Sequence, residues 1–111
     1  MAENPRISGS PRVIHWLGEG PIMDVPLSYP PDNIWYSAFV IEPSHVSHKT
    51  RIERGEARIE LESASPDPRV ALEWLAEHLT RVNQRAGEMR SRIRKAQTEA
   101  TAWWENSHSV E

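Results

Sequence analysis

Residues 72–103 read LEWLAEHLTRVNQRAGEMRSRIRKAQTEATAW and carry the most specific structural pattern in the chain. Apolar or small residues recur along it at alternating spacings of three and four, which is a heptad repeat. The heptad positions are Leu72, Leu75, Leu79, Val82, Ala86, Met89, Ile93, Ala96, Ala100 and Trp103. The repeat predicts one continuous helix over residues 67–105, about 57 Å long.

The ends of this helix also carry sequence signals. Ser65 or Asp67 is expected to cap its start, because their side-chain oxygens accept hydrogen bonds from free N–H groups of a first turn. Pro68 falls where a missing N–H costs nothing. Gly87 costs the helix about 1 kcal/mol relative to alanine. A helical hairpin bent at Gly87 would not need to keep the heptads in phase, so one unbroken helix is favoured.

A helix of this length is too long for the rest of the chain to cover. A β-domain of about 50 residues has a radius of gyration of only about 10 Å. We therefore expect part of the heptad stripe to bind another protein chain. The expected apolar contacts are Leu79, Val82, Met89, Ile93, Ala96, Trp103 and Trp104, with Arg85, Arg90 and Arg92 selecting an acidic partner surface.

Charges beside the heptad stripe disfavour the simplest oligomer. In a parallel homodimer Arg85 would face Arg90 of the other chain, and no flanking pair would be attractive. An antiparallel pair brings Arg85 opposite Glu99, which is more favourable. The sequence predicts a homo-oligomer or a larger assembly and leaves the helix orientation open.

Upstream of the helix, two segments have the pattern of β-hairpins. Residues 13–25 contain two short strand-like runs around a three-residue glycine loop at 18–20. Within residues 49–62, apolar and charged residues alternate on either side of Gly55, as in strands with one solvent-exposed face. A charged helix is the alternative for residues 49–62, and Gly55 counts against it.

Between these hairpins lies an uncharged run at 34–41, IWYSAFVI. Both of its alternating faces are apolar, which is typical of a central strand covered on two sides. Three prolines precede it within residues 26–33, where we expect a turn, and Glu42-Pro43 ends it. We therefore predict a central strand at 34–41.

These elements give an α+β fold, in which a small antiparallel β-domain precedes one long C-terminal helix. The predicted divisions are a flexible arm at 1–11, the β-domain at 12–62, the helix at 67–105 and a tail at 106–111. The arm is polar and interrupted by proline and glycine, so we expect it to be disordered unless something binds it. The aromatic residues of the β-domain are expected to form its core.

Composition excludes several classes of protein. The 111 residues include no cysteine, which removes disulfide scaffolds, thiolate metal sites and cysteine nucleophiles. The longest uncharged apolar run, 34–41, is far shorter than the roughly 20 residues of a membrane-spanning helix. The first six residues lead into no apolar segment, so we expect no secretory signal and a cytoplasmic location, or one within a virus particle.

A basic stretch provides the alternative function. Arg81, Arg85, Arg90, Arg92, Arg94 and Lys95 lie within fifteen residues whose only acid is Glu88. Such a stretch would suit nucleic-acid phosphates, in a small nucleic-acid-binding or transcription-regulating protein. It lacks interleaved aromatics, and the net charge of the chain is −3, so a solvated helix face is the favoured interpretation.

Catalysis has little support in the sequence. His45 and His48, with His15 upstream, are the only metal-like cluster, and loop histidines without a metal are far commoner. No G-x-S-x-G, H-E-x-x-H or phosphate-binding loop is present. We therefore expect no enzyme, cofactor or metal site. Trp103-Trp104 is flanked by Glu99 and Glu105, which favours contact with protein over contact with a membrane.

The expected function is therefore protein–protein assembly. A flexible arm, a small β-domain and a long helix recur together in proteins that assemble, including components of phage and virus particles, and this likeness is one of architecture only. The sequence predicts a non-enzymatic structural protein that oligomerises, or docks onto other chains, through its C-terminal helix.

Overall fold

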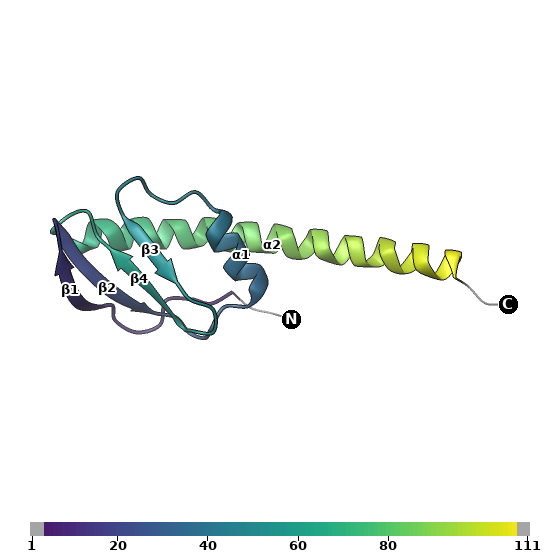
Figure 1. Cartoon of the computed structure of the whole chain (residues 1–111), viewed down its shortest axis with the longest axis horizontal. Helices are drawn as coiled ribbons and strands as arrows, with labels where there is room; N and C mark the ends of the chain where they lie inside the picture. The colour runs from purple at the N-terminus through teal and green to yellow at the C-terminus, as the bar shows by residue number, and fades with distance from the viewer. Residues whose placement is uncertain (1–3, 109–111) are drawn as a thin grey trace.

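The structure, a computed structural model, describes residues 4–108. Four strands and two helices follow one another as β1 (Arg12–Leu17), β2 (Gly20–Pro26), α1 (Asn33–Ile41), β3 (Lys49–Ile52), β4 (Arg58–Glu62) and α2 (Pro68–Ser107). The strands form one antiparallel sheet in the order β1-β2-β4-β3. This sheet followed by one long C-terminal helix confirms the predicted α+β class (Figure 1).

The core lies between the sheet and the first half of α2. Alternate residues of the central strands are buried, Met23 and Val25 on β2 with Ile59 and Leu61 on β4. They share one apolar cluster with α2 residues, among them Leu75, Leu79 and Val82. Alternate residues of the strands therefore pack against one face of α2, as expected for a helix that covers one face of a sheet.

Both predicted hairpins are present. β1 and β2 pair across a two-residue turn that contains Gly18 at φ +66°, one residue shorter than the predicted loop. β3 and β4 pair across a turn that contains Gly55 at φ +83°. A positive φ is costly for residues with a Cβ, which explains the glycine at each turn.

The predicted strand at 34–41 is wrong, because these residues form helix α1. The Asp32 carboxylate accepts a hydrogen bond from the Trp35 N–H at 2.8 Å and caps the helix. Trp35, Ala38 and Phe39 are buried, at the i, i+3 and i+4 positions of a helical face, while Val40 and Ile41 are exposed. A short run that is apolar at every position suits either element, and the capping aspartate before it was the deciding signal.

The N-terminal arm is ordered by its own chain, contrary to the expected disorder. Ile7 forms a β-bridge with Leu27, and backbone bonds of 2.8 Å join Ser8 N to Pro26 O and Ser28 N to Arg6 O. Pro5 is buried. Residues 1–3 of the predicted arm and 109–111 of the predicted tail lie outside the described residues.

Helix α2 is much longer than the domain against which it packs (Figure 1). The Cα radius of gyration is 18.4 Å, whereas about 13 Å is typical of a compact chain of this length. From Pro68 to Met89 the helix contributes to the core or lies beside it, and from Ser91 to His108 every residue is exposed. A coiled coil is not confirmed, because the heptad stripe up to Ala86 is filled by the chain's own core.

Candidate protein-binding surface

The structure divides the predicted contact residues into two groups. Leu79 and Val82 are buried in the core, at 6% and 0% exposure, and are therefore unavailable to a partner. Met89 is half-buried and packs against the same core. The remaining apolar contacts, Ile93, Ala96, Trp103 and Trp104, lie in the projecting part of α2 and are exposed.

Two of the three arginines expected to select a partner are engaged within the chain. Arg85 Nε donates to Glu42 Oε2 at 2.9 Å, and Arg81 lies 3.4 Å from the other oxygen of the same carboxylate. Glu42 is the C-cap residue of α1, so this cluster fastens α1 to α2. Arg85 is thus engaged within the chain, and the cluster of two guanidiniums and one carboxylate keeps a net positive charge.

Arg90 bonds α2 to the rest of the domain at the point where the helix projects beyond it. Its guanidinium donates to Asn4 Oδ1 at 2.7 Å and to Asp32 Oδ2 at 3.1 Å. Burial opposes ionisation of Asp32, but the Trp35 N–H and Arg90 outweigh it and keep the pKa of this carboxyl below its ordinary value. Arg90 therefore ties the arm, α1 and α2 together, and of the three predicted arginines only Arg92 faces solvent without an ion pair among the described residues.

We define the distal segment as residues 91–107, the part of α2 that projects beyond the domain (Figure 1). The exposed fractions of Ile93, Trp103 and Trp104 are 51%, 63% and 58%. Gln97, Ala100 and the two tryptophans border a shallow depression on this surface. Trp104 also stacks on His108 with ring centroids 3.7 Å apart. The distal segment thus carries a bare apolar stripe on one helix face.

A second exposed apolar feature, missed by the sequence analysis, is strand β1. All six of its residues are exposed, including Val13, Ile14, Trp16 and Leu17. Trp16, which the sequence assigned to the core, is 53% exposed. The sequence carries no signal for this exposure, because a run that is apolar on both faces is equally typical of a strand buried on two sides.

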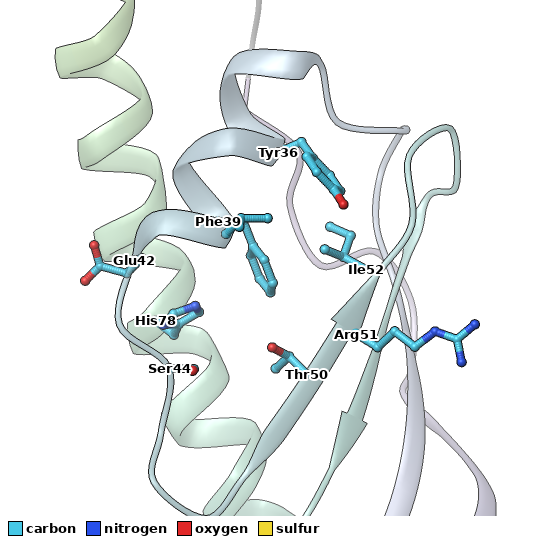
Figure 2. Close-up of a pocket in the computed structure, with 9 residues that line it drawn as sticks. Tyr36, Phe39, Glu42, Ser44, Thr50, Arg51, Ile52 and His78 are labelled. Carbon is cyan, nitrogen blue, oxygen red and sulfur yellow. The ribbon is translucent and has the colours of Figure 1, made fainter.

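A cleft of about 350 Å³ lies between α1, β3 and α2 (Figure 2). Phe39 and Ile52 form apolar walls, and the Arg51 guanidinium points away from His78. His78 is 1% exposed and its ring lies between Trp74, stacked at 4.8 Å, and Phe39, in edge contact at 5.3 Å. Its Nδ1 has no hydrogen-bond partner among the described residues.

The cleft does not form a catalytic constellation. Ser44 and Thr50 line it, but His78 makes no hydrogen bond to either hydroxyl. Burial lowers the pKa of His78, with Arg81 lowering it further and Glu42 partly opposing the shift. A neutral, stacked imidazole is consistent with a core residue.

His45 and His48 accept hydrogen bonds from the backbone. His45 Nδ1 accepts from the N–H groups of Ser47 and His48, and His48 Nδ1 accepts from Ala64 N–H at 2.9 Å. His15 lies on β1, away from both. Within residues 4–108, no group of three or more histidine, aspartate or glutamate side chains is close enough to hold a metal ion.

Searches of protein-family models, curated proteins and solved structures returned no match to this chain. Among residues 4–108, no helix is both long enough and apolar enough to cross a membrane. The distal segment combines exposed apolar side chains with the heptad spacing that, earlier in the same helix, is buried in the core.

Proposed function

We propose that this chain is a non-enzymatic assembly protein that docks onto other protein chains through the distal segment of α2. One observation carries the proposal. The stripe that is buried at Leu75, Val82 and Ala86 continues without a break in phase to Ile93 and Trp103, where none of residues 4–108 covers it. The same pattern serves as core in the first half of the helix and as an uncovered surface in the second.

The energetics of helices support this proposal. Isolated helices shorter than about 12–15 residues are marginal in water, and most helical stability in proteins comes from packing an apolar face. The distal segment has 17 residues, from Ser91 to Ser107, without such packing. A partner that covers Ile93, Trp103 and Trp104 would supply the missing burial, at about 25 cal/mol per Å² of apolar surface.

The nucleic-acid alternative is weaker than the sequence suggests. Arg81 and Arg85 share the single carboxylate of Glu42, and Arg90 pairs with Asp32, so two of the six positive charges of the basic stretch are compensated within the chain. Arg92, Arg94 and Lys95 remain without an ion pair among the described residues. Titration of labelled DNA and RNA at two salt concentrations tests this alternative, and tight binding that falls steeply with salt would favour it.

The test of the proposal is the mass of the protein in solution by light scattering. We expect the wild type to exceed the 12.7 kDa of one chain at high concentration, and Ile93→Asp to return it to that mass, because a charge would enter the apolar contact. Thr98→Asp is the matched control, since it adds the same charge on the outward face of the same segment.

Two further results would contradict the proposal. The first is an oligomer that Ile93→Asp leaves unchanged, which would place the contact elsewhere. The second is a monomeric wild type that retains the same proteins from a host extract as Ile93→Asp does. A role as a particle component, as the sequence suggested, is one setting for such assembly and remains a prediction.

A further inference from the structure

We infer that the partner of the distal segment is a second copy of this chain. The two copies pack antiparallel about a two-fold axis that crosses the pair at the level of residue 98, on the face opposite the Thr98 side chain. The inference rests on the proposed function and specifies its partner and geometry. Three observations carry it: the position of the domain on α2, the register of the heptad stripe, and the separation of charge along the distal segment.

The position of the domain excludes a parallel pair in register. A heptad stripe drifts by only about 20° per heptad around a straight helix. Ile93 and Ala96 therefore point to nearly the same side of α2 as Leu79 and Val82, which the sheet and α1 cover. Two parallel copies joined along this side would bring their domains into the same space. Antiparallel copies place the two domains at opposite ends, away from each other.

The register follows from the heptad positions. In an antiparallel pair each a position lies opposite a d position of the other helix. When residue numbers of facing positions sum to 196, Ile93 meets the partner's Trp103 and Ala96 meets the partner's Ala100. Each contact occurs twice. Large side chains then flank a centre of small ones, where two helices approach closely, and the axis at 98 lies one residue from the midpoint of the distal segment.

Neighbouring registers fit the chain less well. A shift by one heptad step in one direction brings the partner's Trp103 opposite Ala86, which is fully buried in the core. A shift in the other direction moves the position opposite Ile93 beyond Ser107, where α2 ends. The intermediate register alone covers the whole bare stripe without entering the domain. The register with Arg85 opposite Glu99 is also excluded, because Arg85 is held by Glu42.

Charge is separated along the distal segment in the sense that an antiparallel pair requires. Its first part carries Arg92, Arg94 and Lys95 and no acid, and its second part carries Glu99 and Glu105 and no base. An antiparallel partner sets the basic part against the acidic part, whereas a parallel partner sets like against like. Glu99 lies one residue from the axis and approaches its own copy there, an exposed repulsion that salt screens.

Orientation is measured with two single-cysteine variants, Ser91→Cys and Glu105→Cys. The chain has no native cysteine, so each variant takes one spin label. Both positions lie on the outward face, and in the inferred register Ser91 of one chain lies at the same level along the axis as Glu105 of the other. Two labels at position 91 are then offset by 14 residues along the axis, about 21 Å, whereas labels at 91 and 105 in a mixed pair have no axial offset.

We expect pulsed dipolar spectroscopy to find a shorter distance in the mixed sample than in either single-variant sample. A parallel pair reverses this order, which would overturn the inference and leave the assembly function intact. A light-scattering mass of three or more chains would overturn the two-fold pair and would likewise leave the assembly function intact. A labelled protein that remains monomeric at every concentration would overturn the second copy as the partner.

A variant pair provides an independent readout. Ile93→Asp places a charge at both ends of the symmetric contact, opposite the partner's Trp103, and we expect the dissociation constant to rise at least about 100-fold. Glu99→Gln removes the repulsion at the axis, and we expect equal or tighter association that depends less on salt. A salt dependence that Glu99→Gln leaves unchanged would contradict the inferred register, because no repulsion between the two copies of Glu99 would then lie at the axis.

Discussion

Two buried histidines make the stability of the domain depend on pH. His48 is 4% exposed and uses Nδ1 to accept the Ala64 N–H, so its proton resides on Nε2 and protonation would break the bond. His78 is enclosed by Trp74 and Phe39. Burial lowers the pKa of both, with His45 adding to the effect on His48. Both side chains are therefore held neutral by folding.

We expect the free energy of unfolding to be highest above about pH 7 and to fall toward pH 5. Below the ordinary histidine pKa of about 6.5 the unfolded chain binds protons that the folded chain does not bind. Each group then lowers the free energy of unfolding by up to about 1.4 kcal/mol per pH unit. Urea unfolding at pH 7.5 and 5.5 measures the loss. His78→Leu should reduce it, and His15→Asn, at an exposed position, serves as the control. Equal stability at both pH values would refute this account.

At the scale of elements, two glycines predict opposite effects of the same substitution. A Cβ at Gly20, where β2 begins, would lie 2.4 Å from the Ser63 carbonyl oxygen and 2.5 Å from that of Ser65. A Cβ at Gly87, where α2 leaves the domain, would meet nothing within 4 Å. We expect Gly20→Ala to cost about 1–3 kcal/mol and Gly87→Ala to stabilise by up to about 1 kcal/mol. Urea unfolding of the two variants measures both changes in the free energy of unfolding. Changes of the same sign would contradict the prediction.

Period-based reasoning predicted the elements whose pattern is unambiguous. Alternation identified β4, and the heptad repeat identified nearly the whole of α2. It failed at α1, because a run that is apolar at every position has no period to read. There the decisive feature was local, the Asp32 side chain that caps the helix.

The candidate surface was predicted only in part, for a different reason. A heptad stripe looks the same whether the chain's own sheet or another chain covers it. The sequence therefore assigned Leu79 and Val82 to a partner although the sheet buries them. Ion pairs such as Arg85–Glu42 join residues 43 positions apart, and only the fold brings them together.

At the scale of the whole molecule, folding and association share one helix. The principal extents of 69 × 24 × 17 Å reflect α2, which belongs to the core at one end and to the proposed contact at the other. Association would therefore add packing to a segment whose helical state is marginal alone. We expect the midpoint of thermal unfolding, followed by circular dichroism, to rise with protein concentration.

The comparison for this prediction is Ile93→Asp. Its midpoint should be independent of concentration, because it lacks the association that links the two processes. A wild-type midpoint that is constant over a hundredfold range of concentration would contradict the linkage. A rise of equal size in Ile93→Asp would place the association at another surface.

The contacts of Arg90 have a mechanical consequence. Within residues 4–108 they are the hydrogen bonds farthest along α2 that join it to the domain, and Gly87 lies about one turn before them. Beyond Arg90 the helix is a lever of 17 residues, about 26 Å long. A tilt of about 10° at its base displaces the tryptophans near its tip by about 4 Å, roughly the width of a methylene group. The amide oxygen of Asn4 and the carboxylate of Asp32 thus act with the core packing of α2 to fix the angle at which the chain presents its far end.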